Sequence, residues 1–230
     1  MNVSDAARHD RTGDDTMIFR KQDDTGFISF DNGDRPLSDF RTSAVLEVMP
    51  WRRAGEPLHC GRAEVCYDDS ALYVRMRAYE TDIIASRRAF GEPVCRDSCL
   101  EFFFAPVPGS NAYFNFEVNP LATMYVGFSP SGTREGSRLL PDPDIRDNAF
   151  FSASARFIPG GWEVSYAIPY AFIRRYAPEY KTPQSGEILR CNFYTCCDDA
   201  KEPYYSVWHT VDAPAPDYHR PESFGALVFE

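Results

Sequence analysis

The sequence lacks long apolar runs and a basic excess. No segment has the roughly 20 consecutive apolar residues that a membrane-spanning helix needs, and the first fifteen residues, MNVSDAARHDRTGDD, lack the apolar core of a signal peptide. Lys and Arg number 24 against 34 Asp and Glu, a net charge of −10, which argues against a nucleic-acid or anionic-membrane partner. We therefore expect a cytoplasmic protein as the sequence stands, or a periplasmic or secreted one if a leader was removed.

Common catalytic and metal-binding motifs are missing as well. The four histidines form no i, i+4 pair and no HExxH, and no glycine loop for phosphate is present. Ser129 lies in GFSPS, which departs from the G-x-S-x-G nucleophile motif at Pro130 and at the final glycine. The seven cysteines are odd in number and lack the spacing of a disulfide scaffold. Reduced thiols are the simplest interpretation, and a zinc site with Cys196 and Cys197 would lack the usual spacing.

What the sequence does have is a strong β pattern. Hydrophobic residues make up 43% of the chain and aromatic residues 15%, which indicates a globular protein. Period-two alternation is typical of strands with one buried face, and it occurs in residues 63–78, 99–104, 113–119 and 150–168. Residues 170–176 form the one plausible helix. These features predict an all-β, antiparallel β-sandwich with one short helix, a single domain over 16–230 preceded by a disordered segment at 1–15.

Two of the alternating runs predict a hairpin with a pair of carboxylates. Their buried faces must coincide, which favours Phe102 opposite Phe116 and therefore Glu101 opposite Glu117. Facing carboxylates repel each other, so a cation, a shared proton or an arginine must compensate them. The arginines that we consider as natural counterions are Arg75, Arg77 and Arg190.

The polar face of these strands is the first candidate for a binding site. Amide, carboxylate and guanidinium groups on a rigid sheet can read the hydroxyl groups of a ligand. The candidate ligand-binding residues on this face are Arg75, Glu101, Tyr113, Asn115, Glu117, Arg190 and Asn192.

Successive blocks of the chain resemble a known family. ALYVRMRAYETD, RDSCLEFFFAP, YFNFEVNPLATMYVGF, GGWEVSYAIP and CNFYTC…YSVWHTV…PDYHRPESFGALVF follow in that order over about residues 40–230. Together they resemble the family 9 carbohydrate-binding modules, most closely the stand-alone bacterial proteins like them. The resemblance implies a jelly-roll-like sandwich, structural calcium in some members, and a sugar held between aromatic side chains. Asp97, Glu101 and Glu117 are candidate calcium ligands.

Trp208 lies in the last of these blocks, so we predict that it forms one wall of the sugar site, although a core position is equally compatible with its sequence context. Trp51 and Trp162 do not map cleanly onto a second wall. The favoured function is non-catalytic carbohydrate binding. Two alternatives stay open: a glycoside-processing enzyme that uses Glu101 and Glu117 as paired carboxylates, and a scaffold whose polar face binds another protein.

Overall fold

The protein is represented by a computed structural model that describes residues 16–21, 44–136, 138–140, 145 and 148–229. The disorder predicted for residues 1–15 lies outside this part of the chain. None of the described helices is long and apolar enough to span a membrane.

The described part of the chain is built from strands with a single α-helix, α1 (Tyr170–Tyr176), where the sequence predicted one. Short 3₁₀ turns occur at Val94–Arg96, Asn148–Phe151 and Pro221–Ser223. The strands are β1 (Thr16–Lys21), β2 (Ala44–Leu46), β3 (Cys60–Tyr67), β4 (Ala71–Tyr79), β5 (Cys99–Ala105), β6 (Tyr113–Val118), β7 (Met124–Ser129), β8 (Arg138–Leu139), β9 (Ser154–Ile158), β10 (Gly161–Pro169), β11 (Ile188–Cys197), β12 (Tyr204–Val207) and β13 (Gly225–Phe229).

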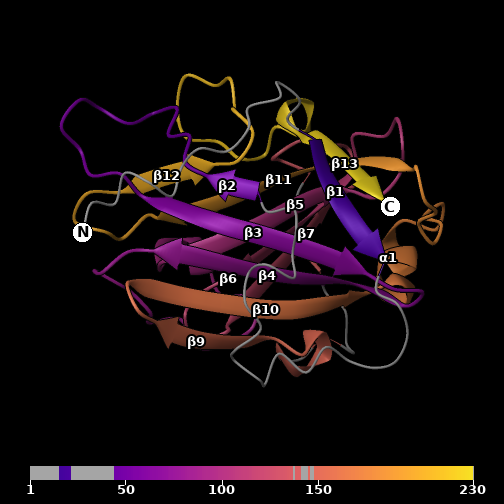
Figure 1. The fold of residues 1–230 in the computed structure, drawn as a ribbon, viewed down its shortest axis with the longest axis horizontal. Helices are drawn as coiled ribbons and strands as arrows, with labels where there is room; N and C mark the ends of the chain where they lie inside the picture. Colours follow the sequence, from indigo (N-terminus) through magenta and orange to yellow (C-terminus); the bar gives the residue numbers. More distant parts are fainter. Residues whose placement is uncertain (1–15, 22–43, 137, 141–144, 146–147, 230) are drawn as a thin grey trace.

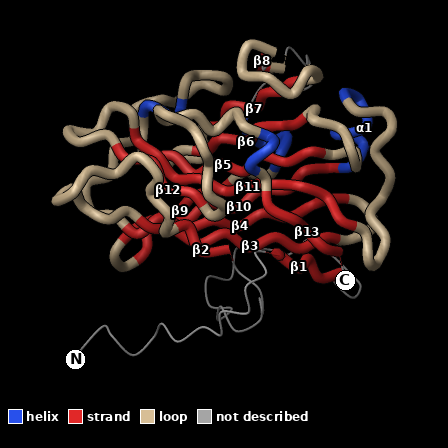
Figure 2. The backbone as a smooth tube through the Cα atoms, turned by 90° about the horizontal axis from the view of Figure 1, so that it is seen from above, coloured by secondary structure: helices blue, strands red, loops and turns tan. Residues whose placement is uncertain are grey.

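The strands form two layers, shown in Figure 1 and, from above, in Figure 2. Sheet A has the order β8-β7-β6-β5-β11-β13, with β12 also paired to β11. Sheet B has the order β3-β4-β10-β9, with β2 also paired to β3. The predicted β-sandwich is confirmed, with antiparallel pairing between the strands within each of these two sets.

β1 departs from the antiparallel prediction because it joins the two sheets. Thr16 to Phe19 pair in parallel with β13, and Arg20 and Lys21 pair in parallel with β3. One strand thus serves two partners in succession. Nothing in its sequence indicates this arrangement, because the partners are the last strand of the chain and a strand some forty residues downstream.

The inward faces of the two sheets make the core. On β5 and β6 the alternation places Phe102 and Phe116 inside as direct cross-strand partners, which confirms the predicted register. Phe102 also stacks on Phe193 of β11, with ring centroids 4.8 Å apart. Phe172 of α1 packs edge-on against Phe116, so the helix closes one end of the core. Full burial of each such ring stabilises the fold by roughly 1.5–3 kcal/mol.

The outward face of sheet A, which carries the predicted polar residues of β5 and β6, is covered by other parts of the chain. Its residues pack under the loops that follow β12 and precede β5, in an outer cluster that includes Phe103, Tyr113, Tyr194, Val211 and Tyr218. Because these loops cover the sheet, the polar side chains between the aromatic ones are buried too. This cover turns a flat sheet face into a pocket.

Some predicted boundaries move for local reasons. The strand predicted from residue 150 begins at Ser154, because residues 148–151 form a 3₁₀ turn. β12 ends at Val207, and the short strand β8 lies in the segment between β7 and β9.

Candidate functional site

A pocket of about 180 Å³ lies on the covered outer face of sheet A. The strands supply its floor, and the loops around residues 95, 134, 198 and 216–219 supply most of its walls. The lining residues are Cys95, Glu101, Glu117, Arg134, Cys196, Asp198, Tyr205, Pro216, Asp217, Tyr218 and His219.

The floor of the pocket holds the predicted carboxylate pair. Glu101 and Glu117 are direct cross-strand partners and are only 3% and 7% exposed. Asn115 Nδ2 donates a hydrogen bond of 2.9 Å to Glu117, and Cys196 Sγ donates one of 3.1 Å to Glu101. Burial raises the pKa of both carboxyl groups, and the charge of Glu117 raises the pKa of Glu101 further. Near neutral pH the pair therefore does not carry two full negative charges.

Aromatic rings form one side of the pocket. Tyr205 and Tyr218 line it, and their ring centroids lie 6.2 Å apart at a steep angle. Trp51 packs against both rings, with centroids 6.2 Å from Tyr205 and 6.1 Å from Tyr218. Its indole N–H donates to the carbonyl of Ala213 over 2.7 Å, which fastens the Pro-rich loop to the rest of the protein. Tyr218 is also stacked on Tyr194 at 4.0 Å, so its ring is held rigidly.

Charged and polar groups complete the lining of the pocket. Arg134 pairs with Asp217 at 3.1 Å and is largely exposed. His219 Nδ1 lies 2.6 Å from the hydroxyl of Tyr113, and burial, aided by the charge of Arg134, lowers the pKa of His219 to about 4. The hydroxyl of Tyr205 donates to Asp198 over 2.9 Å, which links the aromatic side to an acidic group.

A buried aspartate, Asp97, ties together loops that continue into the walls of the pocket. Asp97 accepts hydrogen bonds of 2.7–2.9 Å from the backbone N–H and side chain of both Ser86 and Arg87, and from Asn119. Burial alone would raise the pKa of Asp97, but these donors outweigh it and lower the pKa to about 2. Arg87 also forms an ion pair with Asp199 at 2.9 Å, so one network connects the loop before β5 with the loop after β11.

The structure brings together only part of the predicted ligand-binding set. Glu101 and Glu117 line the pocket, and Asn115 and Tyr113 contact lining residues. Arg190 instead donates to the carbonyls of Ser110 and Pro221 and to the side chain of Asn111.

Asn192 also holds a loop. Its amide donates to the carbonyl of His209 and accepts from the backbone N–H of the same residue, at 2.9 and 3.0 Å. It therefore fixes the chain just after β12 and does not line the pocket.

The predicted arginine counterions were wrong. Arg75 pairs with Glu64 at 2.6 Å and Arg77 pairs with Glu163, all within sheet B. β4 belongs to that sheet, so its outward face and the pocket lie on opposite sides of the sandwich. The carboxylate pair instead accepts hydrogen bonds from Asn115 and Cys196.

The tryptophans are placed differently from one another. Trp208 is partly buried, packs against the inner core and meets Phe193 edge-on with centroids 5.8 Å apart. It is not among the residues that line the pocket. Trp162 is fully buried and donates to Glu80 over 2.6 Å. Trp51 is the tryptophan next to the pocket, behind its tyrosines.

Sequence reasoning missed Arg134, Asp198, Tyr205, Tyr218 and His219 as pocket residues. All but Tyr205 lie in loops, where no periodicity shows which way a side chain points. The available signal was the cluster of tyrosine, histidine and acidic residues in the Pro-rich segment 212–221, since surface loops often carry binding residues.

The donor atoms at the pocket floor do not suit calcium. Calcium prefers six to eight oxygen ligands, whereas Glu101 has thiols for neighbours and Asp97 is already surrounded by N–H and O–H donors. Calcium binding elsewhere on the chain stays a prediction. Among the described residues, one group of at least three His, Cys, Asp or Glu ligands lies close together, and it consists of Cys99, Glu101 and Cys196.

Solved structures with the same fold belong to carbohydrate-binding proteins. A candidate carbohydrate-binding protein from Bacteroides uniformis ATCC 8492 superposes with a TM-score of 0.76 at 19% identity, covering 94% of this chain and 99% of that one. A family 9 carbohydrate-binding module from Caldicellulosiruptor kristjanssonii matches in its cellotriose complex (TM-score 0.60, 14% identity, 94% and 93% covered). The same module matches in its glucose complex (0.58, 13%, 94% and 95%). At these identities the likeness establishes the fold alone.

The family itself is established by the sequence. The model of carbohydrate-binding family 9 matches residues 44–229, which is most of the chain. The protein therefore belongs to carbohydrate-binding family 9, as the resemblance of its sequence blocks predicted. Among curated protein sequences, none matches this chain.

Proposed function

We propose that the protein binds carbohydrate without cleaving it, in the pocket on the outer face of sheet A. The observation that carries the proposal is the composition of this pocket: two tyrosine rings on one side and two buried carboxyl groups on the floor. A sugar ring has apolar C–H patches that pack on aromatic rings, and hydroxyl groups that need both donors and acceptors. Membership of carbohydrate-binding family 9 supports the same ligand class.

Different residues of the pocket supply the apolar surface and the hydrogen-bonding groups. Tyr205 and Tyr218 supply the apolar surface, and Glu101 and Glu117 supply hydrogen-bonding groups. Arg134 and His219 add further polar groups to the lining. Because Tyr218 is stacked on Tyr194 and Trp51 backs both tyrosines, the aromatic side is pre-formed, which lowers the entropy cost of binding.

The size of the pocket favours a small ligand. Its volume of about 180 Å³ is below the roughly 300–1,000 Å³ of sites for drug-sized molecules. We expect it to hold a monosaccharide or the end of a longer chain. Glucose and cellotriose, which occur in complexes of structural neighbours, are the first probes to use.

Binding is favoured over catalysis by the way the carboxyl groups are held. Glu117 is engaged by Asn115 and Glu101 by the thiol of Cys196, and both carboxyl groups lie at the floor of a narrow pocket. A glycosidase needs one carboxyl group on each side of the scissile bond. Two neighbours on one sheet face below the ligand do not provide that arrangement.

Isothermal titration with glucose and cellotriose tests the proposal. The wild type should bind saturably, and Tyr205→Ala should weaken binding at least tenfold because it removes a stacking ring. Tyr205→Phe keeps the ring and loses the hydrogen bond to Asp198, so it should retain more affinity than the alanine variant. Phe157→Ala, which removes an exposed ring from sheet B, is the matched control and should bind like the wild type.

The enzyme alternative is tested in the same samples. Incubation with oligosaccharides should release no reducing ends above a protein-free blank. Saturable binding without turnover supports the proposal, and turnover that is lost in Glu101→Gln or Glu117→Gln would replace it with the enzyme. Binding to none of a broad array of glycans would refute it.

A further inference from the structure

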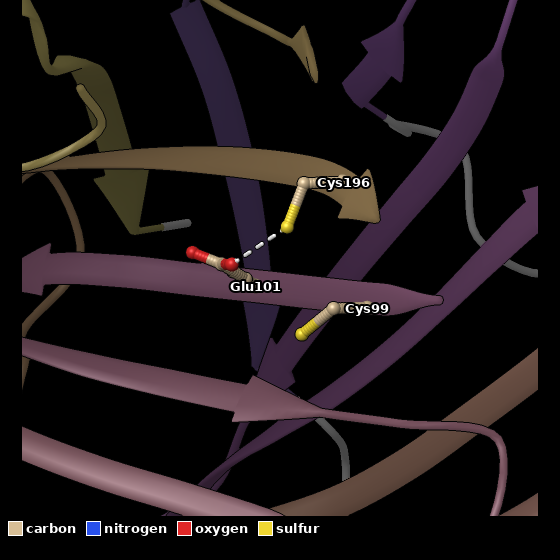
Figure 3. A group of neighbouring side chains, drawn as sticks. All are labelled: Cys99, Glu101 and Cys196. Atoms are coloured by element: carbon tan, nitrogen blue, oxygen red, sulfur yellow. Dashed lines mark hydrogen bonds between the residues drawn. The ribbon is translucent and has the colours of Figure 1, made fainter. Parts of the chain in front are cut away.

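We propose that Cys99, Glu101 and Cys196 form a binding site for a thiophilic divalent cation, with zinc as the best match. One ligand atom from each residue lies within 4.8 Å of the other two. Cys196 Sγ and Glu101 Oε1 are 3.1 Å apart. Figure 3 shows Cys99 and Glu101 on β5 and Cys196 on the neighbouring strand β11, with the Cys196 thiol directed at the carboxyl group.

Strand register brings these three side chains together. Cys99 and Cys196 are direct cross-strand partners, and Glu101 lies two residues along β5 on the same face. The ligand atoms of tetrahedral zinc lie roughly 3.5–3.8 Å apart, given bonds of about 2.3 Å to sulfur and about 2.0 Å to oxygen. The 3.1 Å between Cys196 Sγ and Glu101 Oε1 and the 4.8 Å limit for the whole group bracket this range, so side-chain movements of up to about 1 Å would close the site around an ion.

The chemistry of the three ligands selects the ion. Two thiols and one carboxyl group match zinc and other thiophilic ions, whereas calcium and magnesium prefer oxygen ligands alone. As each metal–sulfur bond forms, the thiol proton leaves to the solvent. No electron transfer accompanies the step. Three protein ligands leave a fourth position for a water molecule or another group.

The pocket provides that fourth position and a favourable charge. Glu101 and Cys196 both line it, so an ion bound to them faces its open volume. Asp217 of the lining is paired with Arg134, but Glu117 and Asp198 add further acidic groups, so acidic groups in the lining exceed basic ones. A cation is therefore the charge that this pocket favours.

The inference does not rest on the proposed function, because metal binding is measured without sugar. The two are nonetheless linked through Glu101, which belongs to the pocket floor and to the proposed ion site. We expect saturating zinc to change the affinity for a sugar that binds in the pocket, and sugar to change the affinity for zinc by the same factor.

The experiment uses the full chain, reduced with a phosphine and freed of metal. It is titrated with Co²⁺, which reports thiolate ligation by a sulfur-to-metal charge-transfer band, and then with Zn²⁺ in competition. We expect one equivalent of Co²⁺ to produce the band and Zn²⁺ to abolish it. Cys196→Ser should weaken Zn²⁺ binding at least tenfold. Cys66→Ser, which changes a buried cysteine of sheet B, is the matched control and should keep wild-type affinity.

Several outcomes would overturn the proposal. One is the absence of a thiolate band in the wild type, and another is equal Zn²⁺ affinity in Cys196→Ser and Cys66→Ser. If Cys196→Ser does not fold, Cys99→Ser takes its place, and alkylation of the wild type with and without Zn²⁺ is mapped by mass spectrometry. Failure of Zn²⁺ to protect Cys99 and Cys196 in this assay would also overturn it. So would a Cys99–Cys196 disulfide whose reduction restores no metal binding.

Discussion

Replacing Asp97 should destabilise the protein more than its single charge would suggest. The carboxylate is fully buried and accepts five hydrogen bonds of 2.7–2.9 Å from Ser86, Arg87 and Asn119. Removing one partner of a buried ion pair costs about 3–5 kcal/mol, because the remaining groups lose their compensation. We expect this loss of unfolding free energy for Asp97→Ala.

Asp97→Asn should cost less, about 2–4 kcal/mol, because the amide keeps the volume and one acceptor oxygen but turns an N–H₂ group toward existing donors. The lowered pKa of Asp97 gives an independent measure of how strongly the folded protein stabilises this carboxylate. Lowering it from 3.8 to about 2 corresponds to roughly 2 kcal/mol of preference for the charged form in the folded state. Against a total stability of about 5–15 kcal/mol, either loss is large.

Urea unfolding at pH 7, followed by tryptophan fluorescence, measures these losses by linear extrapolation. Asp212→Asn, at an exposed aspartate in the loop after β12, is the control and should lie within about 0.5 kcal/mol of the wild type. If Asp97→Asn unfolds together with Asp212→Asn, the hydrogen-bond network does not stabilise the loops, and the account of how the pocket is held is wrong.

Three further predictions concern the pocket and its neighbour. Burial raises the pKa of Glu117 from 4.5 to about 7, so its stabilising contribution is full below pH 4.5 and is lost as the pH rises through about 7. In the wild type the unfolding free energy should therefore fall by roughly 3 kcal/mol across this range, and Glu117→Gln should remove that fall. His219 acts in the opposite sense, because its pKa is lowered from 6.5 to about 4 and stability is lost as the pH falls through this window. His219→Gln should remove this loss of unfolding free energy at low pH. An unchanged dependence of unfolding free energy on pH in the variant would refute the burial of His219. Trp208→Ala should lower the unfolding free energy by about 2–4 kcal/mol through the contact with Phe193, while sugar affinity stays within twofold of the wild type; a large loss of affinity in a stable variant would return Trp208 to the ligand site.

Much of the fold was predictable from local pattern. The alternation of Phe102, Phe116 and their neighbours sets which side chains face inward, because successive residues of a strand point to opposite sides. Matching the two buried faces then placed Glu101 opposite Glu117, as the structure has it. The helix at Tyr170–Tyr176 was equally visible.

The same alternation predicted only part of the pocket. Period-two alternation says that a residue faces outward, but it does not say whether a loop will cover it. Arg75 and Glu101 both face outward, yet they lie on opposite sides of the sandwich, because β4 and β5 belong to different sheets. The assignment of β4 and β5 to different sheets is therefore the reason why Arg75 is not the counterion of Glu101.

From the sequence by itself, the β-sandwich class, the faces of its strands, the facing glutamates and the family could be determined, since each depends on residues near one another in the chain or on ordered blocks of sequence. The tertiary structure alone decided that β1 joins the two sheets, that Tyr205, Tyr218 and His219 meet over the glutamates, and that Cys99 and Cys196 become neighbours. Those contacts join segments as much as about two hundred residues apart. They depend on how the whole chain packs, which no local pattern encodes.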